Sequence, residues 1–430
     1  MSSAWLLFGT FLLLCLLRAP VAVALLLSAV VAAWREGVDL IIVAQQIWQG
    51  LDSFTMLAIP LFLLAGTFME SGGIVTRIAK FADTCVGHVT GSLGHVVVVC
   101  NMVLAGVSGS ATADAAAVGG MFIPMMKKNG YSGELAAAIS AAAATMGPII
   151  PPSLIMVVYA STAGVSTGAL FLAGVLPGIL VGITQMIVVY RTAKKENLLA
   201  AHGRAPLAQV WKDFLTCLPA LLVPFIIIVG IVAGIFTATE AAMVAAVYCL
   251  LVAMFVYRTI RARDLFRLFK SAAISSAPCL FCIASASFFG WMLAYLNIPN
   301  LLMSVMSRFV SSTTSLLLVF TVLFIIIGMF MDALPAIVIF YPIVNAMSLS
   351  IGCDPMHVAI VISLVLCFGL MTPPYGITLL LSSQIAGVRS MDAAKLLFPF
   401  YFMFLVLVLV VIFVPEIALF LPKLLMPSAF

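Results

Sequence analysis

Two short stretches of this sequence place small, polar and helix-breaking residues inside a chain that is otherwise apolar. The first is Gly106-Val-Ser-Gly-Ser-Ala-Thr-Ala-Asp114, and the second is Thr145-Met-Gly-Pro-Ile-Ile-Pro-Pro-Ser153. Backbone carbonyls freed where a helix breaks, together with serine and threonine hydroxyls, supply the oxygen ligands that a cation stripped of water needs. In a membrane such breaks persist only where they are buried in protein or line a cavity. The two stretches therefore mark a candidate binding site.

The composition identifies the class of protein that must hold these stretches. Of the 430 residues, 64% are hydrophobic and 8% are charged, whereas about a quarter of the residues of a soluble domain are charged. Apolar runs long enough to cross a bilayer recur along the chain, which predicts an all-α polytopic membrane protein in a lipid bilayer. Basic loops account for the net charge of +5, so no nucleic-acid partner is expected.

Loop charges orient the predicted spans. Lysine and arginine gather in residues 191–212 and 258–270, which the positive-inside rule places in the cytoplasm. Working outward from these loops gives ten full spans, two helical hairpins and external termini. Arg18 lies either in a turn between two short spans or at a break within one long helix. For residues 88–126, the charges allow a re-entrant hairpin or two full spans with an external turn.

An internal repeat favours the re-entrant hairpin. A shift of 218 along the sequence pairs glycines, prolines and aspartates, and after a four-residue insertion the shift becomes 222. The pairs are Pro60 with Pro278, Gly72 with Gly290, Ser110 with Gly328, Asp114 with Asp332, Pro124 with Pro342, Gly130 with Gly352, Gly147 with Gly369, Pro151-Pro152 with Pro373-Pro374 and Pro177 with Pro399. The loop charges give the two repeats opposite orientations in the membrane, so the repeats are inverted.

The repeats predict two halves with the same parts. The first half, residues 1–212, contains a hairpin at 88–126 and a broken helix near 145–153. The second half, residues 213–430, contains a hairpin at 308–348 and a broken helix near 371–376. Inverted repeats of this kind place a binding site where the two halves meet.

These features resemble the large membrane subunit of tripartite ATP-independent periplasmic (TRAP) transporters, within a broader group of inverted-repeat, elevator-type carriers. The resemblance covers essentially the whole chain. Its most specific parts are Ser108-Gly-Ser110-Ala-Thr, Gly147-Pro-Ile-Ile-Pro-Pro-Ser153, Gly234-x-Phe-Thr-Ala-Thr-Glu240-Ala-Ala, Gly328-Met-Phe-Met-Asp332 and Thr372-Pro-Pro-Tyr-Gly376. The second hairpin tip lacks Ser-Gly-Ser, so the ion site of the first tip does not carry over to it by symmetry.

The resemblance implies sodium-coupled symport of a small organic acid across the bacterial inner membrane by an elevator mechanism. The hairpins and broken helices would move as a block against a scaffold that includes interfacial segments at 36–53 and 258–271. A soluble periplasmic binding protein would deliver the carboxylate, and a small four-helix membrane subunit would bind alongside. Sodium is the coupling ion, and no cofactor is expected. A self-sufficient Na⁺ or H⁺ symporter without a binding protein is the alternative.

The expected site residues lie at the hairpin tips and the breaks. The sodium ligands are expected among Ser108, Gly109, Ser110, Thr145, Gly147, Gly328, Asp332, Thr372, Pro373 and Gly376. Helix starts with unpaired N–H groups suit a substrate carboxylate, which is expected near Ser110, Pro152, Ser153, Pro374 and Tyr375. Asp114 and Asp332 either bind an ion or cap a half-helix.

An integral-membrane enzyme is a remote alternative. Catalysis would need a nucleophile with a base, or a metal cluster, within reach in the membrane. The sequence contains no H-E-x-x-H, and no serine has a histidine that the repeat would place beside it. We therefore expect a transporter and no catalytic residues.

Overall fold

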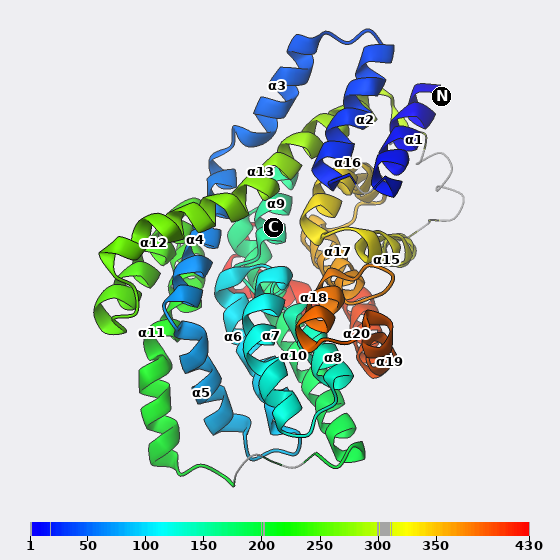
Figure 1. Cartoon of the computed structure of the whole chain (residues 1–430). Coiled ribbons are helices and arrows are strands. Elements are labelled where there is room, and N and C mark those ends of the chain that lie inside the picture. Colours follow the sequence, from blue (N-terminus) through cyan, green and yellow to red (C-terminus); the bar gives the residue numbers. More distant parts are fainter. Residues whose placement is uncertain are drawn as a thin grey trace.

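The computed structural model describes residues 2–17, 19–198, 200, 203–298, 301, 310 and 312–429, and the secondary structure in these ranges is helical (Figure 1). The first half contains α1 (Ser2–Leu16), α2 (Val21–Arg35), α3 (Leu40–Leu51), η1 (Phe54–Leu57), α4 (Ala58–Ser71), α5 (Ile74–Val86), α6 (Ser92–Ser108), α7 (Ala111–Lys128), α8 (Gly133–Ala144), α9 (Leu154–Ala163) and α10 (Thr167–Lys195). The second half contains α11 (Leu207–Val232), α12 (Ala238–Leu251), η2 (Val252–Val256), η3 (Ala262–Asp264), α13 (Leu265–Tyr295), α15 (Thr313–Phe330), α16 (Ala333–Ile351), α17 (Pro355–Leu370), α18 (Ile377–Ala386), α19 (Ser390–Leu396), α20 (Phe398–Phe413), α21 (Glu416–Leu425) and η4 (Pro427–Ala429). The predicted all-α class is confirmed.

Length and composition make seven of the described helices candidates for membrane spans, or eight if the pair α19–α20, bent by 60°, counts as one. Two of the seven, α15 and α16, form the second hairpin. Several of the ten predicted spans instead consist of shorter helices, namely α1, α2, α8 with α9 and α17 with α18. The two counts differ for three reasons: α1 and α2 have only 15 residues each, the sequence-based count treated each interrupted helix as a single span, and it counted α15 and α16 as a hairpin.

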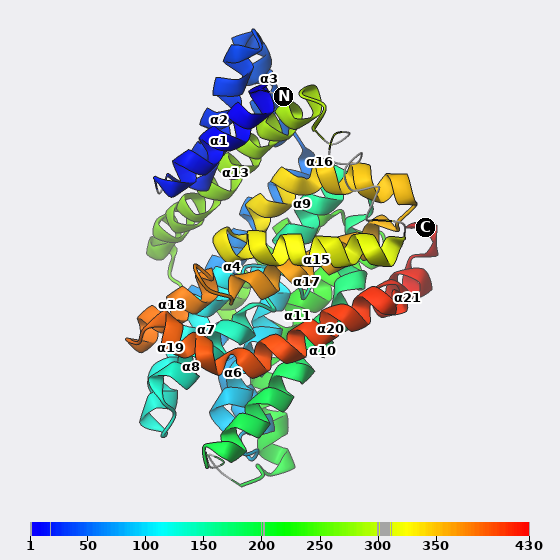
Figure 2. The same cartoon turned by 90° about the vertical axis from the view of Figure 1, so that its right-hand side faces the viewer.

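The first two helices form an antiparallel pair. α1 packs against α2, and the hydroxyl of Ser3, at the start of α1, donates a hydrogen bond to Glu36, which follows the end of α2. The chain therefore turns between these helices and does not continue as one long helix, although Arg18 itself lies outside the described residues. Figure 2 shows α1, α2 and α13 side by side along one edge of the molecule.

Two helical hairpins lie beside the interrupted helices. α6 packs on α7 and α15 packs on α16, and each second arm contacts the interrupted helix of the other half: α7 contacts α18, and α16 contacts α9. The first hairpin covers Ser92–Ser108 and Ala111–Lys128, close to the predicted range 88–126. The second continues to Ile351, and Arg308, its predicted start, lies outside the described residues. Whether both hairpins are re-entrant stays a prediction.

The structure corrects the repeat register at the hairpin tips. Ser110 is the N-cap residue of α7, and Asp332 is the N-cap residue of α16, so the equivalent tips differ by 222 positions. The shift of 218, which paired Asp114 with Asp332 and Ser110 with Gly328, is wrong at the tips. The shift of 218 was favoured because it pairs two aspartates, Asp114 and Asp332. Ser and Asp are equally good N-cap residues, however, so the two helix starts need not share the same residue type. The four-residue insertion therefore precedes the second tip and does not follow Pro124.

The basic segment of the second half also differs from the prediction. Residues 258–271 were expected to be separate from the span that follows, but α13 runs unbroken from Leu265 to Tyr295 (Figure 1). No glycine or proline occurs between positions 265 and 277, so nothing ends the helix there. In the first half, by contrast, α3 ends at Leu51 and Asp52-Ser53 separates it from η1.

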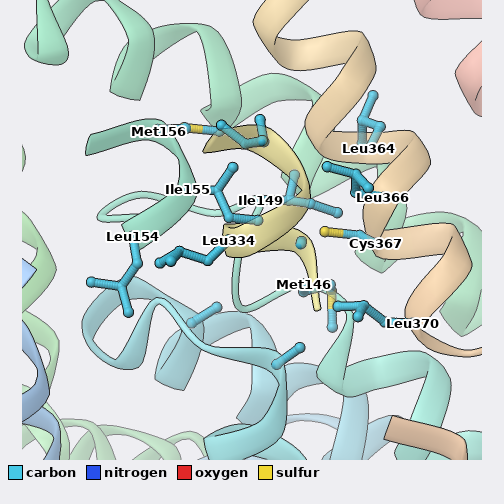
Figure 3. Close-up of a cluster of buried hydrophobic side chains, with 14 of the residues drawn as sticks. Met146, Ile149, Leu154, Ile155, Met156, Leu334, Leu364, Leu366, Cys367 and Leu370 are labelled. Atoms are coloured by element: carbon cyan, nitrogen blue, oxygen red, sulfur yellow. The ribbon is translucent and has the colours of Figure 1, made fainter. Parts of the chain in front are cut away.

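An apolar cluster joins the first interruption to α16 and α17 (Figure 3). Met146 and Ile149 come from the first interruption, Leu334 comes from the first turn of α16, and Leu366 and Leu370 come from α17; all five are buried. Protein interiors are close-packed, so displacing one of these side chains displaces its neighbours. The cluster therefore fixes the site elements of the two halves relative to each other.

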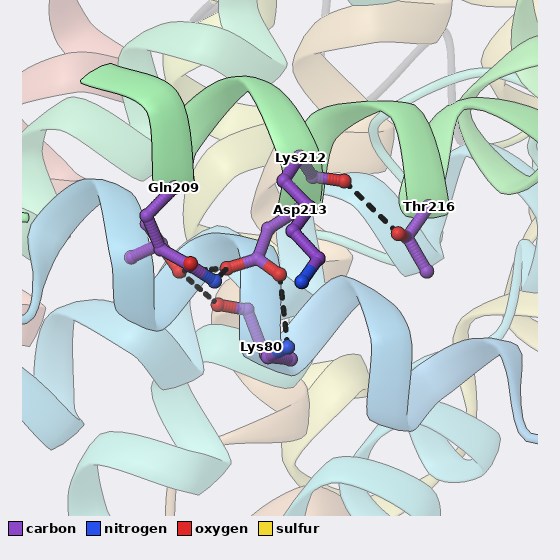
Figure 4. A network of polar contacts seen from close by, with 6 residues as sticks. Lys80, Gln209, Lys212, Asp213 and Thr216 are labelled. Atoms are coloured by element: carbon purple, nitrogen blue, oxygen red, sulfur yellow. Dashed lines mark hydrogen bonds and ion pairs between the residues drawn. The ribbon is translucent and has the colours of Figure 1, made fainter. Parts of the chain in front are cut away.

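A buried polar network joins α5 to α11 (Figure 4). Asp213 is 3% exposed; its Oδ1 lies 2.9 Å from Lys80 Nζ, and its Oδ2 accepts hydrogen bonds from Thr84 Oγ1 at 2.8 Å and Gln209 Nε2 at 2.7 Å. Buried carboxylates require such partners. α11 begins at Leu207, so the predicted division between positions 212 and 213 lies inside this helix.

Candidate functional site

Both hairpin tips face one cavity of about 780 Å³. The first tip contributes Ser108, Gly109 and Ser110, and the second contributes Asp332. α4 and α13 form the opposite wall. Residues of both hairpin tips therefore line the same cavity.

The first tip is a tight turn between α6 and α7. Gly109 adopts φ +61°, a left-handed conformation that glycine accepts at least cost. A Cβ atom at this position would lie 2.8 Å from the Pro152 carbonyl oxygen, so the tip lies directly against the interruption between α8 and α9. Ser110 then starts α7, and its Oγ accepts a hydrogen bond from the Ala113 amide at 3.5 Å.

Asp114 lies one turn inside α7 and is completely buried. Ser108 Oγ donates a hydrogen bond of 2.5 Å to its Oδ1, whereas Oδ2 has no hydrogen-bond partner among the described residues. A Cβ atom at Gly147 would lie 2.6 Å from Oδ2, so the interrupted backbone runs directly past this oxygen. Asp114 does not cap α7, because Ser110 does. Its free oxygen instead faces the first interruption.

The first interruption uses its hydroxyl groups internally. Thr145 Oγ1 donates to the Ala142 carbonyl at 2.6 Å, and Ser153 Oγ donates to the Pro148 carbonyl at 2.5 Å while accepting from the Met156 amide at 3.3 Å. Ser153 therefore caps α9. Thr145 and Ser153 are both fully buried. Because each hydroxyl already donates its hydrogen, only its oxygen lone pairs remain available to a ligand.

The second tip has the same helix ends but different polar chemistry. Asp332 accepts a hydrogen bond from the Ala333 amide at 2.7 Å and caps α16, and its side chain is only partly buried. Gly328 lies against α17: a Cβ atom there would be 2.9 Å from the Leu366 carbonyl oxygen, and one at Gly369 would be 2.5 Å from Gly328. These two glycines allow α15 and α17 to cross in close contact.

The second interruption is tied to α15 and α20. The Gly376 amide donates to the Met329 carbonyl at 3.4 Å, and Tyr401 Oη donates to the Met371 carbonyl at 2.8 Å. Thr372 Oγ1, just beyond the end of α17, donates to the Phe368 carbonyl in the last turn of that helix at 2.7 Å. Gly376 has φ +39°. The peptide bonds Pro151–Pro152 and Pro373–Pro374 are both cis.

The cavity receives only part of the predicted site. Ser108, Gly109, Ser110 and Asp332 line it, whereas the other predicted residues do not: Thr145, Gly147, Pro152, Ser153, Gly328, Thr372, Pro373, Pro374, Tyr375 and Gly376. Tyr375 is 55% exposed. Of the predicted substrate residues, Ser110 alone lines the cavity.

Sequence reasoning missed the opposite wall. α13 contributes polar side chains at positions 267, 271, 275 and 279, and α4 contributes Thr67, Glu70 and Ser71. Spacings of three and four place residues on one face of a helix. The signal in the sequence was therefore a polar stripe along helices that are otherwise apolar.

Known proteins show which family has this architecture. The family model for the tripartite ATP-independent periplasmic transporter, DctM component, matches residues 8–417. The chain belongs to this family. It is 35% identical over 399 residues to the 2,3-diketo-L-gulonate TRAP transporter large permease protein YiaN of Escherichia coli, covering 93% of this chain and 94% of that protein. It is 36% identical over 380 residues to the C4-dicarboxylate TRAP transporter large permease protein DctM of Pseudomonas aeruginosa, covering 88% and 89%.

A solved structure shares the fold at low sequence identity. The Alcanivorax borkumensis YdaH transporter superposes with a TM-score of 0.61 at 14% identity, covering 87% of this chain and 88% of the other. The family match shows that the protein is a TRAP large permease, a multi-pass protein of the inner membrane and a transporter component, as predicted. The two relatives described above are named as permeases.

Proposed function

We propose that this TRAP large permease carries out sodium-coupled uptake of a small organic carboxylate by an elevator mechanism. The observation that carries the proposal is the free Oδ2 of Asp114, a buried carboxylate oxygen without a hydrogen-bond partner among the described residues. A buried carboxylate is costly unless it is neutralised by a proton, a cation or hydrogen bonds. Because the backbone at Gly147 passes beside this oxygen, we assign a dehydrated cation to the position.

Sodium would be cargo that enters and leaves with the substrate. The first sodium would be held between Ser108, Gly109 and Ser110 of the tip and Thr145 and Gly147 of the interruption. Asp114 supplies the negative charge, and the neighbouring hydroxyls and carbonyls supply neutral oxygen ligands. Gly147 matters because the absence of a side chain lets its backbone approach the carboxylate.

The second sodium would use mainly backbone oxygens. The candidate carbonyl groups are those of Gly328, Thr372, Pro373 and Gly376. Gly328 packs against α17, and the Gly376 amide donates to the Met329 carbonyl of α15. Asp332 stands at the same tip, but one of its oxygens is engaged in capping α16. This site would therefore depend less on a carboxylate than the first one does.

The substrate carboxylate is assigned to the first turn of α7. Ser110, Ala111 and Thr112 line the cavity, and first-turn amides of a helix have no intrahelical acceptor. Their N–H groups and the positive end of the helix dipole suit an anion. The start of α16 is less suitable, because Asp332 places a carboxylate at the N-cap itself. In α7 the carboxylate of Asp114 lies one turn further in and would be neutralised by sodium. Pro152 and Ser153 then support the first tip from the interruption between α8 and α9, against which Gly109 packs.

The proposed motion carries both hairpins and both interrupted helices past a scaffold. The hairpins and interruptions contact each other across the two halves, which supports a single mobile unit. α4, α5, α11 and α12 pack together, and the Asp213 network holds α5 to α11. A site between inverted repeats can be exposed to either side by equivalent conformations.

The proposed partners follow from the three-part family. The names of two relatives give 2,3-diketo-L-gulonate and C4-dicarboxylates as substrates, which supports a small organic acid for this permease. A soluble periplasmic protein would deliver it, and a small four-helix membrane subunit would bind beside the large permease. The competing proposal is a self-sufficient Na⁺ or H⁺ symporter of the same fold, favoured if Asp114 takes a proton instead of sodium.

Uptake into proteoliposomes distinguishes these proposals. The permease is reconstituted with its small subunit, with and without the binding protein encoded beside it, under an inward gradient of sodium or of protons. The proposal predicts uptake only with all three proteins and the sodium gradient. Uptake by the permease alone supports the self-sufficient symporter, and uptake driven by protons without sodium contradicts sodium coupling.

A further inference from the structure

α13 presents one polar stripe to the cavity. Arg267, Ser271, Ser275 and Cys279 follow one another at intervals of four residues, and all four line the cavity that contains the hairpin tips. A spacing of four keeps side chains on one face of a helix. Most neighbouring positions on this part of α13 are apolar, so the stripe is specific to the face that meets the cavity.

The charges on the cavity wall are unbalanced for an anionic cargo. Of the described residues that line it, Glu70, Asp114 and Asp332 are acidic and Arg267 is cationic. With sodium on Asp114, as proposed above, two negative charges still oppose one positive charge. Carboxylates repel a carboxylate ligand, and walls of low dielectric strengthen that repulsion. A cation on the same wall lowers this barrier.

Arg267 has donors to spare for this task. Its nearest ion-pair partner is Asp264, 3.6 Å away, and the Arg267 side chain is 78% exposed. Exposed pairs of this kind contribute little to stability. A guanidinium group presents five N–H donors in a fork that matches a carboxylate. Ser271, Ser275 and Cys279 continue the wall of the cavity that Asp332 of the second tip also lines.

We propose that the Arg267–Ser271–Ser275 face of α13 is the path along which the substrate carboxylate passes between the hairpin tips and the cytoplasm, with Arg267 as the anion-selective residue at its mouth. This inference rests on the proposed function, because it assumes a carboxylate cargo. The positive-inside rule places the basic start of α13 on the cytoplasmic side, so the path serves release. Arg267 thereby favours anions over neutral or cationic solutes.

A labelling experiment tests the anion selectivity without requiring transport. Ser271→Cys and Ser275→Cys variants react with sulfonatoethyl and trimethylammonioethyl methanethiosulfonates, and mass spectrometry reads each site separately from the native cysteines. The ratio of anionic to cationic labelling rates reports the local potential. Arg267→Gln is expected to lower this ratio about threefold at Ser275, two helical turns away, and more at Ser271.

Lys270→Gln is the matched control. It removes one positive charge from the same helical turn, but Lys270 does not line the cavity. Its charge acts on the labelled sites through solvent that screens it, so the labelling ratio should change less than in Arg267→Gln. An unchanged ratio in Arg267→Gln, or an equal change in Lys270→Gln, overturns the inference.

Transport adds a second readout. In proteoliposomes, substrate is added on the side of the membrane that corresponds to the cytoplasm, where Arg267 lies. Arg267→Gln should then raise the half-saturating substrate concentration about tenfold, as expected for loss of a charge-assisted hydrogen bond. Half-saturation by sodium should stay unchanged, and Arg267→Lys should be intermediate. If the native protein shows no sodium-driven uptake, the proposed function fails while the labelling ratio still decides the role of Arg267. Normal substrate saturation in Arg267→Gln, with normal native uptake, overturns the inference alone.

Discussion

The two hairpin tips occupy equivalent places in the repeats, yet their aspartates do different work. At the first tip a serine caps the helix, and Asp114 lies one turn further in, buried and with one oxygen free of hydrogen bonds to the described residues. At the second tip Asp332 itself caps the helix and accepts the Ala333 amide. The position of an aspartate relative to the start of the helix decides whether its charge is available to a cation.

The largest expected effect separates these two aspartates. Asp114→Asn removes the charge beside Gly147 and should reduce sodium-driven uptake at least tenfold, because hydrogen bonds and ligands that involve a charged group contribute about 1.5–3 kcal/mol. Asp332→Asn keeps an N-cap residue of equal quality and should reduce uptake about threefold or less. Initial uptake rates at varied sodium concentration measure both. Equal losses in the two variants would remove the difference between the tips.

The repeat-related glycines sharpen the comparison. A Cβ atom at Gly147 would lie 2.6 Å from Asp114 Oδ2, so Gly147→Ala should raise the half-saturating sodium concentration about tenfold in protein that still folds. A Cβ atom at Gly369 would lie 2.5 Å from the backbone of Gly328. Gly369→Ala should therefore separate α15 from α17 and lower thermal stability. Sodium titration of uptake and thermal unfolding in detergent measure the two effects. The account is contradicted if Gly369→Ala changes sodium half-saturation while Gly147→Ala changes only thermal stability.

A smaller effect is expected at the cap of the first tip. Ser110→Ala removes the acceptor for the Ala113 amide and a hydroxyl that lines the cavity. Loss of an N-cap costs about 1 kcal/mol, so sodium activation should weaken about fivefold. Ser110→Thr keeps both groups and should behave nearly as the native protein. Unchanged sodium activation in Ser110→Ala would take Ser110 out of the ligand set.

The smallest effect on transport is expected far from the tips. Asp213→Ala removes the acceptor of the network between α5 and α11, while Lys80 remains 65% exposed and solvated. Stability should fall by about 1–2 kcal/mol, the order expected for losing buried hydrogen bonds. Uptake per folded molecule should change less than twofold. Thermal unfolding and uptake, normalised to folded protein, check this; a change in sodium half-saturation would tie the network to the ion site.

Much of this architecture could be predicted from the sequence. Gly109, Pro151-Pro152 and Pro373-Pro374 lie where helices end because glycine permits a left-handed turn and proline lacks an amide donor. Those rules act locally, so they are readable without the fold. The unbroken start of α13 was harder, because the sequence there carries charges typical of a loop but no residue that ends a helix.

Contacts across the fold could not be predicted in the same way. Sequence comparison paired Asp114 with Asp332 because both are acidic. The starts of α7 and α16 show that Ser110 is the counterpart of Asp332. The proximity of Gly147 to Asp114 depends on how α7 packs against the first interruption. Arg267 lies in a basic segment that has the composition of a cytoplasmic loop. Only the packing of α13 shows that it lines the cavity.

Sodium-dependent thermal stabilisation of the purified permease tests the central claim most directly. A cation that binds the folded state raises the unfolding temperature in proportion to RT ln(1 + [Na⁺]/Kd). With choline as the matched salt, the native protein and Asp332→Asn should both be stabilised by sodium, and Asp114→Asn should be stabilised far less at every concentration. Stabilisation of Asp114→Asn with the native midpoint and amplitude would contradict the assignment of the cation to Asp114.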